Sequence, residues 1–242
     1  MTSPLVSMLG KLTLGLALLA LLLLLAAGPG TRFGVWEYGS GFLLMRIAFF
    51  AGLGAAALGL LFLLIPRTRA AGVLPPALAL VLGLATAWVP WSGVQKARSL
   101  PYIHDISTDT QDPPAFVAVL PLRADAKNPP EYAGEEVAAQ QREAYPDVQT
   151  LELSMGADEA FDRALEVAAG LGWEIVASAA DEGRIEATDT TFWFGFKDDV
   201  VIRIEGSASE SQLDMRSKSR VGRSDVGANA ERIRRFVAAF RG

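Results

Sequence analysis

The sequence predicts an α+β protein, with three N-terminal transmembrane helices followed by a two-layer domain whose antiparallel sheet carries two helices on one face. Residues 1–98 hold three long apolar runs and a single acidic residue, Glu37. Residues 151–242 switch between strand and helix periodicity in the order β-α-β-β-β-β-α, with short turns between neighbouring strands. Residues 99–150 contain turn-forming stretches such as TQDPPAF and NPPEYAGEE, which predict an irregular tether between the two parts.

The three apolar runs are long enough to cross a bilayer, which takes roughly 20 mostly apolar residues. They are Leu12–Ala27, which extends back to Leu5, then Phe42–Ile65 and Val73–Val94. Arg46 lies near the start of the second run, where its long side chain can reach the interface. Small residues also recur at spacing four in this run, which either permits close helix packing or reflects the abundance of alanine and glycine. These pairs are Gly52 with Ala56 and Ala55 with Gly59.

The loop PRTRAAG between the second and third runs has the densest positive charge, so the positive-inside rule places it in the cytoplasm. Residues 101–242 then lie outside the cytoplasm, and the protein is expected to be a multi-pass protein of the inner (plasma) membrane. The first run also has the lysine, apolar core and small residues of a cleaved signal peptide. Cleavage would leave the location of the C-terminal domain unchanged.

Charge is divided unevenly along the chain. Residues up to Arg98 include seven basic residues and one acidic residue, which leaves 15 basic and 26 acidic residues for the remainder. Such an acidic domain argues against nucleic acid as a partner. The expected partners are the lipid bilayer and another membrane or envelope protein. The chain has no cysteine, which excludes disulfides, thiolate metal sites and cysteine nucleophiles, and we expect no cofactor.

The C-terminal domain is read element by element. TLELSM alternates as a strand, and DEAFDRALEVAAGLG places four apolar residues on one helical face (Phe161, Leu165, Ala168 and Leu171). WEIVASA, RIEATDTTFWFGF and DDVVIRIEGS follow as strands, with a hairpin turn at Asp181–Gly183 between the first two. The final segment GANAERIRRFVAAF forms the second helix. In the preceding tether, Glu135–Tyr145 predicts a short helix that Pro146 ends.

The strand QLDMRSKSRVG divides its residues between two faces, because strand side chains alternate with period two. Leu213, Met215, Ser217, Ser219 and Val221 share one face, and Asp214, Arg216, Lys218 and Arg220 share the other. With the apolar face under the two helices, we expect the basic face to point outward.

Three stretches resemble one known family. They are YIHDISTDTQDPPAF, WFGFKDDVVIRI and RSKSRVGRSDVGANAERIRRF, and QQREAYPDV and GWEI agree with the membrane-attached members. The family is the bacterial domain-of-unknown-function family 1499 (DUF1499), and the resemblance covers roughly residues 100–240. Many members open with an asparagine–cysteine segment, whereas this chain resembles the subgroup with IHDIST. The resemblance implies an architecture and no activity, so no catalytic residue is carried over.

The stretch RSKSRVGRSDVGAN supports two hypotheses. In the first, a row of basic side chains beside a helix N-terminus binds an anion or a partner; its residues are Arg216, Lys218, Arg220 and Arg223. In the second, the same residues pair with Asp198 and Asp199 of the neighbouring strand, while Asp225 and Asn229 act as turn and cap residues. The second, structural hypothesis is favoured.

A metal or catalytic site has weaker support. His104 is the single histidine, and with Asp105, Asp109 and Asp112 it offers nitrogen and oxygen ligands to a divalent cation. The spacing matches no known metal loop, and the same residues suit an extended segment with turns. We therefore expect a non-enzymatic binding or assembly role in the cell envelope. The alternative is a metal-dependent or other hydrolytic enzyme that uses His104 and the nearby aspartates.

Overall fold

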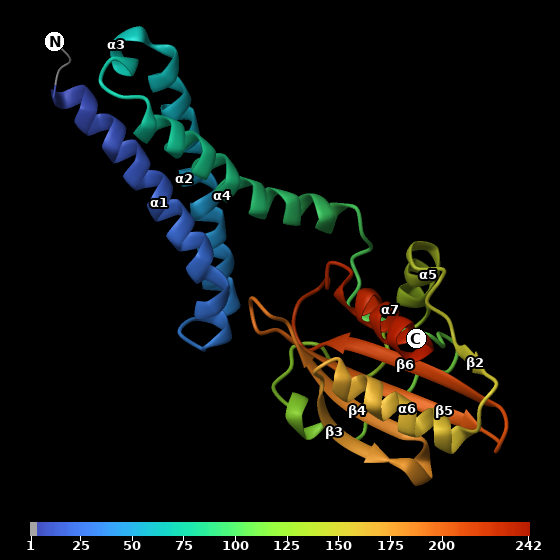
Figure 1. Cartoon of the computed structure of the whole chain (residues 1–242). Helices are drawn as coiled ribbons and strands as arrows, with labels where there is room; N and C mark the ends of the chain where they lie inside the picture. Colours follow the sequence, from blue (N-terminus) through green and yellow to red (C-terminus); the bar gives the residue numbers. More distant parts are fainter. Residues whose placement is uncertain (1–3) are drawn as a thin grey trace. The chain divides into compact units, whose positions relative to one another are not determined.

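A computed structural model describes residues 4–242 and divides the chain into two compact units. The first unit holds the residues up to Lys96 together with Phe192–Gly195. The second unit holds Ala97–Thr191 and Phe196–Gly242. Figure 1 shows the helices of the first unit and the sheet and helices of the second.

Three long helices make up most of the first unit, and a short one follows the second of them. The three predicted apolar helices are present, and each is long and apolar enough to be a candidate membrane span. They are α1 (Pro4–Arg32), α2 (Tyr38–Leu64) and α4 (Leu74–Arg98), with the single turn α3 (Pro66–Arg69) between the last two. The basic loop PRTRAAG begins at α3.

Small residues line the contacts between these helices. The buried residues of α1 recur at alternating spacings of three and four (Gly10, Thr13, Ala17, Ala20, Leu24 and Ala27), the pattern of left-handed helix packing. A Cβ added to Gly52 would lie 2.8 Å from the Gly83 carbonyl oxygen, and one added to Gly59 would lie 2.5 Å from that of Pro76. These glycines therefore allow the backbones of α2 and α4 to approach closely. Ala55 and Ala56 are buried beside them.

The short segment Phe192–Gly195 clusters with the first unit. Within that unit the Phe194 ring lies 5.1 Å from the ring of Phe42, and Arg32 donates a hydrogen bond of 2.8 Å to the carbonyl oxygen of Phe192. The aromatic run TTFWFGF is therefore divided between the two units.

The second unit is built on a six-stranded antiparallel sheet in the order β1-β6-β5-β4-β3. The remaining strand, β2, pairs with the first residues of β6, and β1 pairs with residues near its end. The strands are β1 (Asp105–Ser107), β2 (Leu151–Leu153), β3 (Glu174–Ala179), β4 (Arg184–Thr190), β5 (Lys197–Gly206) and β6 (Ser211–Ser219). The helices are α5 (Glu135–Ala144), α6 (Ala157–Gly170) and α7 (Ala228–Arg241), and the 3-10 turns are η1 (Pro121–Arg123) and η2 (Ala180–Glu182). From β2 onward the order of strands and α-helices is the predicted β-α-β-β-β-β-α.

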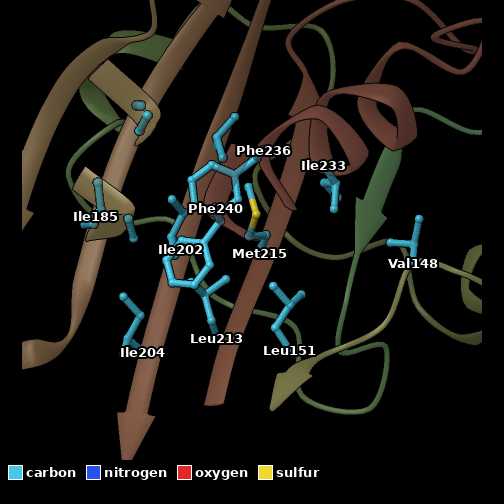
Figure 2. Close-up of a cluster of buried hydrophobic side chains, with 14 of the residues drawn as sticks. Val148, Leu151, Ile185, Ile202, Ile204, Leu213, Met215, Ile233, Phe236 and Phe240 are labelled. Atoms are coloured by element: carbon cyan, nitrogen blue, oxygen red, sulfur yellow. The ribbon is translucent and has the colours of Figure 1, made fainter. Parts of the chain in front are cut away.

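Helices α6 and α7 cover one face of the sheet, which we call the inner face (Figure 1). Strand alternation supplies its apolar residues, including Val200, Ile202 and Ile204 of β5. Figure 2 shows Phe236 and Phe240 of α7 directed at this layer, near Ile202 and Met215. The two-layer α+β class is therefore confirmed.

The turn between β3 and β4 depends on one glycine. Gly183 has a φ of +60°, a conformation that L side chains rarely adopt, and a Cβ there would lie 2.1 Å from the Ile204 carbonyl oxygen. The predicted hairpin turn therefore needs glycine for both its backbone angle and its close approach to β5.

Residues 99–150 differ from the expected tether. They belong to the compact second unit, and β1 pairs with β6 from Asp105↔Lys218 to Ser107↔Arg216. Apart from α5, most of the remainder packs on the sheet through hydrogen bonds between its backbone and buried side chains, so no periodic pattern marks it in the sequence. The predicted short helix is present as α5, and its Gln141 hydrogen-bonds both the amide and the carbonyl group of Ser107.

Candidate functional site

The basic side chains of β6 lie on the face of the sheet opposite α6 and α7, which we call the outer face. Arg216 is registered with Val201 of β5, and Lys218 with Asp199. Ser217 between them faces the inner side and donates a hydrogen bond to Asn229 of α7. The alternation expected from the sequence is therefore present.

The outer face is not open at this point. Residues 108–133, here called the cover segment, pack over it, and Arg216 and Lys218 are only 2% and 1% exposed. Carbonyl oxygens of the cover segment accept hydrogen bonds from these cations. Arg216 donates to the Pro130 oxygen at 2.8 Å, and Lys218 donates to the Glu131 oxygen at 2.6 Å. The row of cations thus faces protein instead of solvent.

One buried carboxylate neutralises the first part of this row. Asp105 of β1 accepts two hydrogen bonds of 2.9 Å from the Arg216 guanidinium and one of 2.9 Å from the Lys218 ammonium. Bidentate arginine–carboxylate pairs are geometrically specific and strong. Burial nevertheless lowers the pKa of Lys218, because removal from water disfavours its charged form more than Asp105 restores it.

A second buried carboxylate, Asp199, pairs with Arg220 at the end of this row and with Arg123. Its two oxygens accept hydrogen bonds of 2.9 and 2.7 Å from Arg220 and of 2.9 Å from Arg123 of the cover segment. The adjacent Asp198 faces the inner side, where it pairs with Arg232 of α7 at 2.6 Å. Strand alternation explains why two neighbouring aspartates serve different faces. Asp199 is thus a partner of the basic row and Asp198 is not.

Positive charge exceeds negative charge in this layer. Four cations, which we call the cationic layer, face the carboxylates Asp105 and Asp199 (Arg123, Arg216, Lys218 and Arg220). Aromatic rings supply part of the remaining stabilisation. The ring of Phe116 contacts two guanidinium groups, at 4.8 Å for Arg216 and 5.2 Å for Arg123. Tyr132 also stacks on Arg216 at 5.3 Å, and burial raises the pKa of Tyr132 to about 12.

A third carboxylate fixes the middle of the cover segment. Glu186 of β4 is fully buried and accepts hydrogen bonds of 2.8–3.1 Å from the backbone amides of three consecutive residues, Val117, Ala118 and Val119. Successive amides that converge on one point form an anion-binding nest. Here the protein's own Glu186, which also pairs with Arg184, fills that nest.

The second half of the motif shapes the start of α7. Asp225 accepts hydrogen bonds from the backbone amides of Gly227 at 2.8 Å and Asn229 at 3.0 Å, so it satisfies donors that the helix leaves free. Burial raises the pKa of Asp225 in spite of these bonds. The Asn229 side chain bridges Ser217, Ser219 and the His104 carbonyl oxygen. Asp225 thus lies in the turn before α7, whereas Asn229 lies inside its first turn, after the N-cap residue Gly227.

Arg223 is the exposed member of the predicted basic set. Its guanidinium lies 5.5 Å from the centre of the Tyr102 ring, and its carbonyl oxygen lies 3.4 Å from Nδ1 of His104. An anion in solvent could reach Arg223 without displacing the cover segment.

The predicted metal ligands are dispersed among other contacts. Asp105 is engaged by Arg216 and Lys218, and burial lowers the pKa of His104. Asp109 accepts hydrogen bonds from the amides of Gln111 and Asp112. Among residues 4–242, no group of three histidine, aspartate or glutamate side chains is placed to hold a metal ion.

Three contributors to this site escaped the sequence analysis, namely Arg123, Glu186 and Arg232. The burial of Arg232 could have been predicted, because helical spacing places it on the same face of α7 as Ile233 and Phe236. The sequence pattern around Glu186 is weaker evidence, since it shows only that Glu186 stands between Ile185 and Ala187 in a strand whose other face is apolar. No pattern predicts the role of Arg123, because it lies in an irregular segment.

Comparison with known proteins gives one result of substance. A family model described as "Protein of unknown function (DUF1499)" matches residues 105–240. No curated protein matches the chain. The matched span begins at β1 and ends in α7, so it includes the cover segment, the cationic layer and the cap of α7. Because this match spans more than half of the chain and confirms the resemblance of the three motifs, the protein belongs to the DUF1499 family of proteins of unknown function.

Proposed function

We propose that this protein is a multi-pass protein of the inner membrane, and that its second unit is an extracytoplasmic, non-enzymatic module for binding or assembly in the cell envelope. The observation that carries the proposal is the closed network on the outer face. Arg216, Lys218 and Arg220 hydrogen-bond the buried Asp105 and Asp199 and also carbonyl groups of the cover segment. This arrangement stabilises the outer face of the domain.

The enzymatic alternative would use His104 and neighbouring aspartates. A general base must reach the proton that it abstracts, and a metal site needs several ligands directed at one point. Both oxygens of Asp105 are instead taken up by Arg216 and Lys218, and Asp109 is bound by two backbone amides. This use of the carboxylates supports a structural role for them.

The basic row has the same interpretation. We propose that Arg216, Lys218 and Arg220 stabilise the domain, since each pairs with a buried aspartate. Arg223 is then the member of the set that an anionic ligand could contact directly. Substitution of Arg216, Lys218 or Arg220 should therefore lower the stability of the domain more than it lowers the binding of a ligand.

The topology rests on the short basic loop at α3. Arg67 and Arg69 are two residues apart, between the end of one candidate span and the start of the next. Basic residues in short loops are retained on the cytoplasmic side, so the polypeptide after α4 emerges on the opposite side.

Fusions at Gly242 test the location of the second unit. Alkaline phosphatase fused there should be active and green fluorescent protein should be dark, because each reporter works on one side of the membrane. Bright fluorescence without phosphatase activity would reverse the topology. Metal analysis of the purified full-length protein tests the metal-dependent form of the enzymatic alternative. Stoichiometric metal that is lost in His104→Ala would favour the hydrolytic alternative.

A further inference from the structure

A hollow opens on the outer face where the cover segment leaves the sheet uncovered. Its volume is about 300 Å³, and it lies over the ends of β4 and β5 and beside η2. The apolar part of its lining comes from Pro113, Pro114, Ala115 and Val117 of the cover segment and from Val201 of β5. All of these residues belong to the second unit.

Two arginines form the polar base of the hollow. Arg184 and Arg203 are directly opposite each other in the β4–β5 register. Like charges in such a cross-strand pair repel each other, so carboxylates must surround them. Arg203 donates to Asp112 at 2.8 Å and to Asp109 and Asp214 at 3.2 Å. Arg184 pairs with Glu182 and Glu186. The donors of both arginines are thus largely directed at the protein's own carboxylates.

Carboxylate groups outnumber guanidinium groups around this arginine pair. Glu205 lies 4.0 Å from Arg203, which brings the surrounding carboxylates to six against two guanidinium groups. The three most exposed of these carboxylates also line the hollow. The side chains of Asp112, Glu205 and Glu182 are 83%, 68% and 56% exposed, whereas those of Arg184 and Arg203 are 15% and 20% exposed. The groups available to a ligand are therefore hydrogen-bond acceptors with negative charge.

The cover segment also carries exposed apolar side chains, the first of which lines the hollow. Val117 lines the hollow and is 50% exposed, and Leu120 and Leu122 further along are 40% and 53% exposed. Arg123, the single charged residue between Pro113 and Ala124, points inward and is 4% exposed. A ligand that used both features would need a cationic group next to apolar groups.

We propose that this acidic hollow and its apolar border bind a cationic segment of a partner protein, with a lysine or arginine side chain in the hollow and neighbouring apolar residues on Val117, Leu120 and Leu122. The proposal rests on the proposed role as a binding module and names the partner's chemistry. A small polyamine would satisfy the carboxylates but would leave the apolar border unused, which favours a peptide. Complementary charge would also speed the encounter and select against acidic partners.

The test uses full-length protein in zwitterionic detergent and a labelled peptide, acetyl-Leu-Lys-Val-Lys-Leu-amide, with fluorescence anisotropy as the readout. We expect saturable binding that weakens with salt, and no binding of the matched Leu-Glu-Val-Glu-Leu peptide. The variant Asp112→Asn/Glu182→Gln/Glu205→Gln should weaken binding by about tenfold or more. The control variant Glu159→Gln/Asp162→Asn/Glu166→Gln removes the same charge from α6 and should change binding less than about twofold.

Two further variants keep the test decisive if the triple variant loses stability. Glu205→Gln removes a carboxylate that lies 4.0 Å from Arg203, so it should leave folding intact and still weaken binding about threefold. Leu122→Ser should weaken binding of the peptide and leave binding of spermidine unchanged. The proposal would be overturned if the α6 control variant lost as much peptide affinity as the triple variant, or if spermidine bound as tightly as the peptide. If the fusions at Gly242 support the topology and the peptide still fails to bind, the partner class alone is wrong.

Discussion

The two faces of one sheet are stabilised in different ways. The inner face buries apolar residues under α6 and α7, with Ile202, Met215 and Phe236 at most 1% exposed. The outer face buries arginine, lysine and carboxylate groups under an irregular segment, with Arg216 and Lys218 equally inaccessible. The same strands therefore carry a mainly apolar layer on one side, with the Asp198–Arg232 pair at its edge, and a mainly ionic layer on the other.

The two kinds of layer contribute differently to the stability of the fold and to the position of its segments. Burial of an apolar side chain contributes roughly 1.5–3 kcal/mol and tolerates many neighbours. A buried ion pair gains little overall, because desolvation opposes the attraction, but loss of one partner leaves an unpaired buried charge. We infer that the inner face supplies most of the folding free energy, and that the outer face fixes where the cover segment lies.

The largest expected effect is on the inner face. Phe236 is fully buried and stacks between Trp173, at 5.6 Å, and Phe240, at 5.9 Å. Phe236→Ala should lower the free energy of unfolding by about 3–5 kcal/mol through lost burial and the cavity that remains. Pulse proteolysis of the full-length protein in urea measures it. Leu122→Ala, on the exposed side of the cover segment, should cost less than about 0.5 kcal/mol. Equal losses would remove the distinction between the faces.

The next effect is on the outer face. Asp105→Asn leaves Arg216 and Lys218 buried without their counter-ion and should cost about 3 kcal/mol in the same assay. The half-exposed pair of Asp147 and Arg234 provides a control, and Asp147→Asn should cost less than about 1 kcal/mol.

An apolar replacement sharpens this comparison. If the pair mainly specifies position, Asp105→Leu/Arg216→Met/Lys218→Met should recover about half or more of the free energy lost in Asp105→Asn. The cover segment should then be less protected from proteolysis, because the Pro130 and Glu131 carbonyl groups have lost their donors. Full stability with an unchanged cover segment would contradict a positioning role.

The smallest effect depends on pH. Burial lowers the pKa of His104 below 6.5, although its contact with the Arg223 carbonyl oxygen acts in the opposite direction. A group with a lower pKa in the folded state binds fewer protons there, so stability is complete above about pH 6.5 and declines as the pH falls through the folded pKa. Between pH 7.5 and 5.5, wild type should lose slightly more stability than His104→Gln, because solvent screens this half-exposed group. Asp225 titrates with the opposite sign, because its pKa is raised, and it is common to both proteins. An identical pH profile for the two proteins would show that His104 is not perturbed.

The sequence could predict elements with strong periodicity. The apolar alternation of Val200, Ile202 and Ile204 located β5, and the spacing of Ile233, Val237 and Phe240 located α7. The outer layer could be predicted only in part. Alternation placed Arg216 and Lys218 on one face, but their main partner, Asp105, lies more than 100 residues earlier in a three-residue strand. Such a strand is too short to show a period, and contacts from side chains to carbonyl groups leave no pattern in the sequence.

The most direct test of the outer layer is the backbone amide exchange of Val117, Ala118 and Val119. Hydrogen–deuterium exchange of the full-length protein in nanodiscs, followed on a peptide that covers residues 115–124, measures it. In wild type we expect protection, because the Glu186 carboxylate accepts all three amides. Glu186→Gln should speed exchange there by about tenfold or more, since the amide group cannot match both carboxylate oxygens, and should leave β5 unchanged. Rapid exchange of this segment in wild type, or no change in Glu186→Gln, would contradict the inference that buried charge holds the cover segment in place.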